Sequence, residues 1–448
     1  MWGDIIIAFL LAFITAYVIT PYTMRLAKKV GAIDMPSDRR INKRPMPRLG
    51  GIAVISGFVV SVIYLLTSMV IEGGFGLMEH VTEIIGFFCG IAVLGVVCFI
   101  DDCKDIHPLL KLLAQTISAI IVVACGINIE NMDSPVINNI IQAHPWFSYI
   151  LTVFWIVGIT NAINLIDGLD GLSSGITLIS CISLMIVFTI NESPLLSILL
   201  ITALAGSIVG FLPFNFSPAK TFIGDVGSNF LGFSLAVISI LGVAKTYTAI
   251  VIVAPIIVLG LPIFDTLFAI VRRIYQRKSL KGVFMPDKGH LHHKLMFSLE
   301  LGQTKSVLIL YIATALFSIC SFIHIYSVTA SILLFALLLL VFEIFVEYTN
   351  MISRKYKPIL TILNIFLKRD DLPKIKESKT YLMIAKRHHV KYILIGFLCA
   401  VIAVSGVLVY HNHNDKKPVV NTPVITYEMP NHPTSLMKSV HEDINASH

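Results

Sequence analysis

Long apolar runs, separated by short polar segments, restrict the possible folds of this chain more than any other feature of its sequence. A helix needs about 20 mostly apolar residues to cross the hydrocarbon core of a bilayer. Because lipid offers no hydrogen-bond partners, such a run must satisfy its backbone groups internally, as a helix does. Candidate spans lie at about residues 4–24, 50–70, 83–100, 109–127, 147–165, 172–190, 195–213, 227–244, 246–269, 306–325, 328–347 and 391–410. The sequence therefore predicts an all-α, polytopic membrane bundle of about eleven core transmembrane helices plus one extra C-terminal helix.

The small number and the placement of charged residues support this interpretation. Charged side chains make up 14% of the chain and hydrophobic ones 56%, whereas a soluble domain carries about 25% charged residues. With residue 1 outside, the inside loops are 25–49, 101–111, 166–171, 214–226, 270–305 and 348–391. Of the 34 lysines and arginines, those outside these loops are Lys245, Lys416, Lys417 and Lys438. By the positive-inside rule the loops face the cytoplasm, and no soluble domain remains to carry a nucleic-acid-binding face.

The chain divides into four parts on the same grounds. Residues 1–350 form the predicted transmembrane core, and 351–390 form a basic linker on the inside. The linker either binds anionic lipid or anchors the next span, and anchoring is the favoured interpretation. The additional helix at 391–410 is followed by a polar tail, 411–448, that we expect to be disordered.

The first polar cluster opens the second span. Basic side chains precede Pro45 and Pro47, and Arg48 is followed by Gly50 and Gly51. Anchoring at the membrane surface explains the charge, but it does not explain the change from a restricted to a free backbone. Arg48 is therefore a candidate for binding a phosphate group.

The second cluster directly follows an apolar run that ends at Ile100. Asp101 and Asp102 are adjacent, and Lys111 lies a few turns further along if the segment is helical. Neighbouring carboxylates at a membrane boundary repel each other and are costly to desolvate. Such a pair is favoured where a divalent cation or a cationic group is close, although a solvated helix end is the simpler alternative.

The third cluster is the most specific local signal in the chain. Asn161 and Asn164 are three residues apart and share a face if they end a helix, and Asp167 and Asp170 repeat that spacing. Each aspartate precedes a glycine, which permits a tight turn. Four side chains with hard oxygen atoms between two spans suit the chemistry of Mg²⁺ and phosphate.

The fourth cluster places a carboxylate between glycines. Asp225 lies between Gly224 and Val226-Gly227-Ser228, just before the eighth span. A carboxylate and backbone N–H groups at a helix start can present oxygen ligands and anion-binding donors together. An ordinary N-cap with turn glycines is the alternative.

The fifth cluster lies in the longest inside loop. His290, His292 and His293 fall between Lys288 and Lys294. Their spacing is compatible with zinc, but no cysteine or further ligand pair supports a structural zinc site, so recognition of a phosphorylated sugar is the preferred interpretation. Asp265, near the inner end of its span, is expected to pair with Arg272 or Arg273.

In this order and on one side of the membrane, the five clusters resemble those of the bacterial polyprenyl-phosphate N-acetylhexosamine-1-phosphate transferases. The superfamily also contains the phospho-MurNAc-pentapeptide translocase. The resemblance covers about residues 1–350, and the His-Leu-His-His motif is similar to His-Ile-His-His of the GlcNAc-type enzymes, whereas the translocase typically has Pro-x-His-His-His. The chain departs from the family at Asn42, where a histidine is usual, and at Leu109, where a lysine is frequent.

The resemblance implies roles for individual residues. Asn164 and Asp225 would bind Mg²⁺, with Mn²⁺ as the alternative cofactor. Asp101, Asp102 and Lys111 would be catalytic. Substrate binding would involve Arg48, Asn161, Asp167, Asp170, His290, His292 and His293.

The resemblance also implies a reaction and a location. N-acetylglucosamine-1-phosphate would pass from UDP-GlcNAc to undecaprenyl phosphate, giving undecaprenyl-diphosphate-GlcNAc and UMP as the first step of a cell-envelope polysaccharide. The site would lie on the cytoplasmic face of the bacterial cytoplasmic membrane, in contact with membrane lipids. The alternatives are the pentapeptide translocase and, from another class, a membrane transporter, against which the clustering of acidic residues at inner span ends argues. A homo-oligomer is compatible with the sequence.

Overall fold

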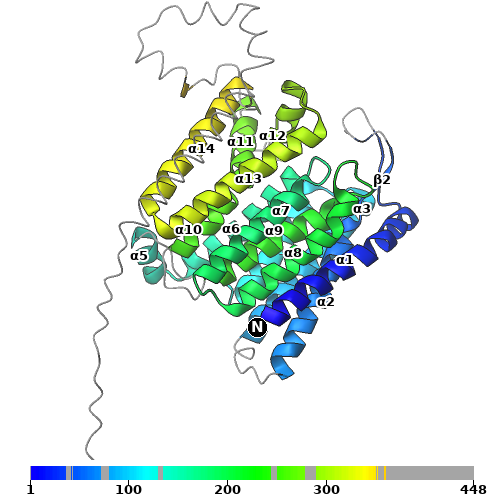
Figure 1. The fold of residues 1–448 in the computed structure, drawn as a ribbon, viewed down its shortest axis with the longest axis horizontal. Helices are drawn as coiled ribbons and strands as arrows, with labels where there is room; N and C mark the ends of the chain where they lie inside the picture. Colours follow the sequence, from blue (N-terminus) through cyan, green and yellow to red (C-terminus); the bar gives the residue numbers. More distant parts are fainter. Residues whose placement is uncertain are drawn as a thin grey trace, which may run out of the picture.

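The structure, a computed structural model, is almost entirely helical. It describes residues 2–36, 42, 44–71, 80–129, 135–243, 250–277, 289–349, 351 and 358–359. The long helices lie side by side in one bundle (Figure 1). The predicted linker 351–390, apart from residues 351, 358 and 359, lies outside the described residues, as do the predicted helix 391–410 and the tail 411–448.

Within the described residues, 9 helices are long and apolar enough to cross a membrane. They are α1 (Trp2–Val30), α2 (Gly50–Ile71), α3 (Val81–Lys104), α6 (Trp146–Ile166), α7 (Leu172–Ile190), α8 (Leu195–Asn215), α9 (Gly224–Val243), α13 (Gln303–Tyr326) and α14 (Val328–Tyr348). Each coincides with a predicted span. The prediction of a polytopic all-α membrane protein is therefore confirmed.

Two other predicted spans take a different form. The run at 109–127 is the 17-residue helix α4 (Pro108–Ala124). The run at 246–269 is not one helix but two, α10 (Ile250–Val258) and α11 (Gly260–Arg277), with a break at Leu259. Pro262 has no N–H to continue the helical hydrogen bonds across the break, and it lies in the first turn of α11, where that N–H would have no partner within the helix. In Figure 1, α11 is inclined to α13 and α14.

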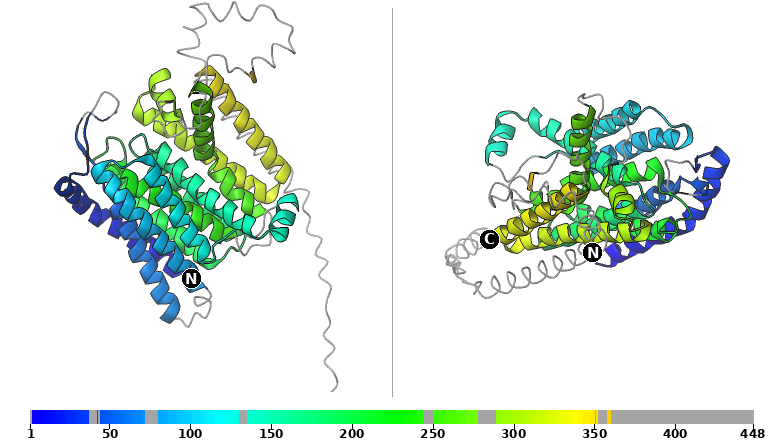
Figure 2. Two further views of the ribbon diagram at one scale, coloured as in Figure 1. Left: turned by 180° about the vertical axis from the view of Figure 1, so that it is seen from behind. Right: turned by 90° about the horizontal axis from the view of Figure 1, so that it is seen from above.

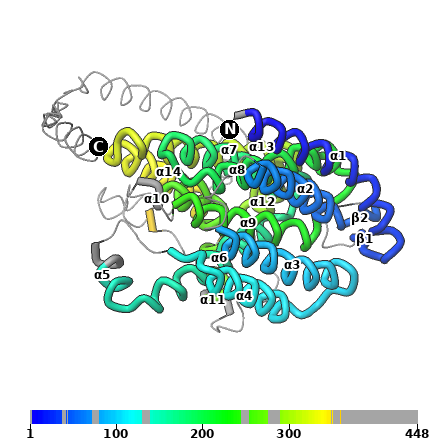
Figure 3. Tube along the Cα trace, turned by 90° about the horizontal axis from the view of Figure 1, so that it is seen from below, coloured from blue at the N-terminus to red at the C-terminus, as the bar shows by residue number. Residues whose placement is uncertain are grey.

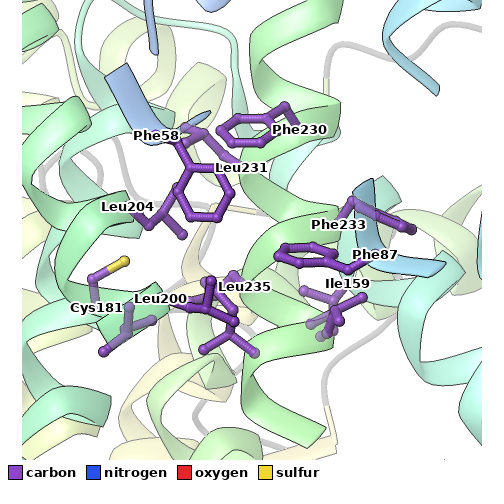
Figure 4. Close-up of a cluster of buried hydrophobic side chains, with 14 of the residues drawn as sticks. Phe58, Phe87, Ile159, Cys181, Leu200, Leu204, Phe230, Leu231, Phe233 and Leu235 are labelled. Carbon is purple, nitrogen blue, oxygen red and sulfur yellow. The ribbon is translucent and has the colours of Figure 1, made fainter. Parts of the chain in front are cut away.

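Helix α9 forms the centre of the bundle. It packs against α2, α3, α6, α7 and α8, and in the view from below in Figure 3 it lies among these helices. In its most apolar stretch 94% of the residues are buried, as expected for a helix that is apolar on every face. Aromatic pairs join it to its neighbours (Figure 4): Phe230 contacts Phe58 with ring centroids 5.5 Å apart, and Phe233 contacts Phe87 at 6.0 Å.

Helix α9 approaches α2 so closely that only glycine fits between them. A Cβ atom built on Gly51 would lie 2.2 Å from the Cα atom of Gly227. The N–H of Gly51 donates to the carbonyl oxygen of Ile223 at 2.8 Å, which ties the start of α2 to the segment that leads into α9. Small residues at helix interfaces are the usual means of bringing backbones together in a membrane.

The buried apolar residues form two main clusters. The first surrounds α9 and includes residues of α2, α3, α6 and α8. The second joins α13 and α14 to the first turn of α7 and to Leu291 and Leu295, which lie in the short helix α12 (Leu291–His293) and the π-helical turn η3 (Lys294–Ser298) that follows it. The two views in Figure 2 show α13 and α14 beside the helices that surround α9.

The polar clusters of the sequence meet at one end of the bundle, which we call the polar end. There α3 ends at Lys104, α4 begins at Pro108, α6 ends at Ile166, α7 begins at Leu172 and α9 begins at Gly224. A small antiparallel hairpin of β1 (Ile33–Asp34) and β2 (Met46–Pro47) lies between α1 and α2. The short helix α5 (Pro135–Ala143), which the sequence analysis does not predict, precedes α6.

Candidate active site

A cleft of about 770 Å³ opens at the polar end. The predicted site residues that line it are Arg48, Asp102, Asn164, Asp167, Asp170, Asp225 and His293. Lys111 adjoins the cleft through its contact with the lining residue Asp225, and Asp101 contacts Lys111 in turn. The structure thus brings together residues from six separate segments of the chain, as the predicted topology requires.

Three side chains from three helices form the central group of the site: Lys111 from α4, Asn164 from α6 and Asp225 from α9. The Lys111 Nζ atom lies 2.7 Å from Oδ1 of Asp225 and 2.5 Å from Oδ2 of Asp101. The Asn164 Nδ2 atom donates to the same Asp225 oxygen at 2.8 Å and to Oγ of Ser228 at 2.8 Å. One ammonium group therefore bridges two carboxylates that would otherwise repel each other.

The side chains of the central group are chemically compatible with a magnesium ion. Asn164 uses its nitrogen as the donor in its hydrogen bonds to Asp225 and Ser228, and it lines the cleft together with Asp225. Among the described residues, no three His, Cys, Asp or Glu side chains are placed to enclose a metal. Mg²⁺ is typically held by one or two carboxylates together with water and substrate phosphates, so the site fits this ion without a full protein cage.

Asp102 lies in the wall of the cleft, where its carboxylate caps the N-terminus of α9. Its Oδ1 accepts from the N–H of Asp225 at 2.9 Å and its Oδ2 from the N–H of Val226 at 3.0 Å. The first N–H groups of a helix have no partners within the helix and attract negative charge. Gly224, with φ of +73°, brings the chain into this arrangement, because a Cβ atom there would lie 1.9 Å from the carbonyl oxygen of Arg48.

Arg48 binds the C-terminal end of α3. Its Nε donates to the carbonyl oxygen of Asp102 at 2.8 Å, and its Nη2 donates to the carbonyl oxygen of Asp101 at 3.3 Å and to Oδ1 of Asp105 at 2.7 Å. Burial opposes the charged form, but the hydrogen bond to Asp105 and the negative charges of Asp102, Asp105 and Asp225 together outweigh it and raise the pKa of Arg48. The guanidinium thus stabilises the C-terminus of α3 while it lines the cleft.

The loop between α6 and α7 contributes two carboxylates with different surroundings. The hydroxyl of Ser173 donates to Oδ1 of Asp167 at 2.6 Å. Burial in the wall of the cleft raises the pKa of Asp167 to about 7. Asp170 accepts from the N–H of Ala219 at 3.0 Å, which ties this loop to the one that precedes α9.

The raised pKa of Asp167 predicts a pH-dependent stability. The folded state holds this proton more tightly than the unfolded chain, whose reference pKa is 3.8. The stabilisation is therefore complete below about pH 4 and is lost as the pH rises through 7. Asp167→Asn mimics the neutral form at every pH, so its melting temperature should gain a few degrees relative to the wild type between pH 5 and pH 8.

Thermal unfolding in detergent at the two pH values measures this difference. Glu300→Gln, which neutralises an exposed carboxyl in the loop before α13, is the matched control and should shift equally at both. An Asp167→Asn curve that stays parallel to the wild type would show that Asp167 is ionised throughout this range.

Only one histidine of the His-Leu-His-His motif faces the cleft. His293 lines it, whereas His290 and His292 are buried. Burial lowers the pKa of His292 to about 3, so its ring is neutral. The rings of His290 and His292 stack with centroids 5.8 Å apart, and the ring of His293 is tilted against that of His292 with centroids 4.5 Å apart.

Asp265 fixes the start of this motif. Its Oδ2 lies 2.9 Å from Nδ1 of His290, and its Oδ1 accepts from the N–H of Leu291 at 2.9 Å. The expectation that Asp265 pairs with Arg272 or Arg273 is thus corrected, because both of its oxygens are bound by the histidine segment. Arg272 instead donates to the carbonyl oxygen of Gly289 at 2.7 Å.

The sequence analysis misses two buried amides next to the central group. Gln115 lies on α4 and Asn229 on α9, each four residues after a predicted site residue, and Asn161 contacts Gln115 rather than lining the cleft. A polar side chain inside an apolar span is costly and is therefore a signal of function or of packing between helices. The spacing of four residues from Lys111 and Asp225 places each amide on the same helix face as its site residue.

A helical membrane bundle whose polar cleft combines carboxylates, an amide and a lysine defines a class of membrane-embedded phosphate-transfer enzymes. The family model described as glycosyl transferase family 4 matches residues 84–243, from α3 to the end of α9. The chain belongs to this family, the polyprenyl-phosphate sugar phosphotransferases.

Three relatives illustrate the range of the family. The chain is 39% identical to the "probable undecaprenyl-phosphate N-acetylglucosaminyl 1-phosphate transferase" of Bacillus subtilis, over 82% of this chain and 98% of that protein. It is 31% identical to the "undecaprenyl-phosphate alpha-N-acetylglucosaminyl 1-phosphate transferase" of Thermotoga maritima, over 75% and 95% of the two chains. A "phospho-N-acetylmuramoyl-pentapeptide-transferase" of Streptococcus thermophilus is also 31% identical, over 52% of this chain and 71% of that protein.

Proposed function

We propose that this protein transfers N-acetylglucosamine-1-phosphate from UDP-GlcNAc to undecaprenyl phosphate, and so begins the synthesis of a cell-envelope polysaccharide. The observation that carries the proposal is that an apolar groove runs between α4 and α6, the two helices that bring Lys111 and Asn164 to the polar cleft. Similarity to the Bacillus subtilis protein along 98% of its length supports the same choice of substrates. We further propose that the site faces the cytoplasm, because the lysines and arginines gather in the loops on that side.

The cleft suits the water-soluble donor. Its volume of about 770 Å³ falls in the range typical of small-molecule sites. Arg48 in the lining and Lys111 beside Asp225 supply positive charge to the cleft. His293 adds an imidazole ring to its lining. Asn164 and Asp225 would hold Mg²⁺, which when bound would neutralise the charge of the donor diphosphate.

An apolar groove between α4 and α6 suits the lipid acceptor. It has a volume of about 800 Å³ and is lined by Thr116, Ile120, Val123, Ala124, Tyr149, Ile150, Val153, Phe154 and Val157. Phe154 and Ile150 are among the most exposed apolar side chains of the bundle. On α4 the groove begins five residues after Lys111, and on α6 it ends seven residues before Asn164. A polyprenyl chain in this groove would bring its phosphate to the central group.

The reaction that fits this arrangement is a direct displacement. A phosphate oxygen of the lipid attacks the β-phosphorus of UDP-GlcNAc, a new phosphorus–oxygen bond forms, and the bond to the bridging oxygen breaks to release UMP. The lipid phosphate is already largely dianionic near neutral pH, because its second pKa is about 6 by analogy with phosphoserine. The protein therefore contributes mainly positioning and charge neutralisation, as in other phosphoryl transfers.

The test measures UMP release by the purified protein with undecaprenyl phosphate, UDP-GlcNAc and Mg²⁺. We expect release to require the lipid, to stop with a chelator and to return when Mg²⁺ or Mn²⁺ is added. UDP-MurNAc-pentapeptide in place of UDP-GlcNAc separates the proposed donor from that of the Streptococcus relative. Absence of UMP with every UDP-sugar, in a lipid-reconstituted and correctly folded preparation, would refute the transferase assignment.

A further inference from the structure

The three helices that carry the central group also carry three amide side chains one turn deeper in the bundle. Gln115 lies four residues after Lys111 on α4, and Asn229 lies four residues after Asp225 on α9. Asn161 lies three residues before Asn164 on α6. These spacings correspond to about one helical turn. We call Gln115, Asn161 and Asn229 the amide layer.

The amide layer is a continuous, directional chain of hydrogen bonds. Asn161 Nδ2 donates to Oε1 of Gln115 at 2.6 Å, and Gln115 Nε2 donates to Oδ1 of Asn229 at 2.7 Å. Asn229 Nδ2 then donates to the backbone carbonyl oxygen of Asp225 at 2.8 Å. The chain thus begins on α6, crosses α4 and ends on the backbone of a residue in the central group.

The position of this chain is unusual for polar groups. The exposed fractions of Gln115 and Asn229 are 1% and 0%, and their helices α4 and α9 contribute buried apolar residues to the first hydrophobic cluster. Hydrogen bonds between helices add little net stability in a membrane, because the unfolded chain finds other partners there. Buried amides are, however, effective in fixing the register of one helix against another. The free-energy cost of burying these amides is therefore better explained by a role in positioning the helices than by a gain in stability.

We propose that the amide layer is a positioning device for catalysis, which sets the distances among Lys111, Asn164 and Asp225. Each member is rigidly connected to one of these residues by a single helical turn. An error of about 1 Å in the placement of reacting groups can reduce a rate by about 100-fold. The three amides touch neither substrate in this role, and they act only through the helices that they join. The inference rests on the proposed transfer reaction.

The test replaces all three amides together with apolar side chains of similar shape: Gln115→Met, Asn161→Leu and Asn229→Leu. This triple variant leaves no amide unpaired, and removal of all partners at once is close to neutral for stability. We expect its melting temperature in detergent to stay near that of the wild type, while kcat for UMP release falls by about 10- to 100-fold. The KM for UDP-GlcNAc should change by less than about 3-fold, because the residues that line the cleft are intact.

Exchange of the side chains at positions 115 and 229 tests the hydrogen bond between Gln115 and Asn229. Gln115→Asn shortens the amide on α4 and should lower kcat, whereas Gln115→Asn combined with Asn229→Gln restores the missing methylene from the other side. Part of the lost kcat should return in the double variant. Ser118→Ala is the matched control, because its hydroxyl is buried on the same helix and has no hydrogen-bond partner among the described residues; its kcat should equal that of the wild type.

Two outcomes would overturn the inference while the proposed function stands. One is a folded triple variant with the kcat of an active wild type. The other is a loss of kcat in the single exchange that the double exchange leaves unchanged. Failure of the wild type itself to release UMP counts instead against the proposed function, so the two are distinguished by the wild-type measurement.

Discussion

Asp225→Asn is expected to lower the rate of UMP release by about 1,000-fold. The change keeps the shape of the side chain but removes the charge that Lys111 approaches to 2.7 Å and that a divalent cation would require. Loss of one electrostatic contact at a reacting centre typically costs 100- to 1,000-fold in kcat, and here the metal and the lysine lose the same partner. The capping of α9 by Asp102 uses the backbone N–H of residue 225, so the helix start should be retained.

The measurement is single-turnover UMP release over a range of Mg²⁺ concentrations, with thermal unfolding as a check of the fold. Glu192→Gln is the control, because it removes a negative charge from an exposed side chain between α7 and α8, at the end of the bundle opposite the cleft. If Asp225→Asn were folded and retained more than about a tenth of the wild-type rate, Asp225 would have no central role in the reaction.

The second large effect concerns stability. Gly51→Ala is expected to destabilise the bundle by about 3 kcal/mol or more, because overpacking of a core costs about 1–3 kcal/mol even where side chains can adjust. At Gly51 the obstacle is the backbone of Gly227, 2.2 Å from the new Cβ atom, which no rotamer change can relieve. Helices α2 and α9 would have to separate, and the start of α9 would move with them.

The matched control is Gly95→Ala on α3, where a Cβ atom meets nothing within 4 Å. This change should be neutral or stabilising by up to about 1 kcal/mol, since alanine favours helix more than glycine does. The two variants are compared by thermal unfolding and by the yield of monodisperse protein in detergent. A Gly51→Ala protein as stable as Gly95→Ala would mean that α2 and α9 are further apart than the structure places them.

Much of the fold follows from the sequence because membrane spans are recognised by length and composition. The runs that became α1, α2 and α9 are apolar over about 20 residues, and no tertiary information is needed to identify them. The meeting of Asp101, Asn164 and Asp225 also follows, since topology places the ends of their helices on the same side of the bilayer. The break at Leu259 had a local signal in Pro262, but apolar length alone did not reveal it.

The roles of individual side chains were harder to predict, because they depend on how each helix is rotated within the bundle. Asp101 and Asp102 are adjacent and therefore point about 100° apart on a helix. One contacts Lys111, and the other turns inward to cap α9. Asn161 and Asn164 share a face as predicted, yet they lie at different depths, and only Asn164 reaches the cleft.

The cleft lies where the two hydrophobic clusters of the protein meet. Lys111 and Asp225 are positioned by helices of the cluster around α9, whereas His293 belongs to a segment anchored by Leu291 and Leu295 in the cluster of α13 and α14. Lys111 and Asp225 on the one hand and His293 on the other are therefore held in place by different apolar clusters. Repacking of the cluster of α13 and α14 would thus act first on the position of His293. Under the proposed function, such a division would let a lineage alter its preference among nucleotide sugars while it inherits the reaction unchanged.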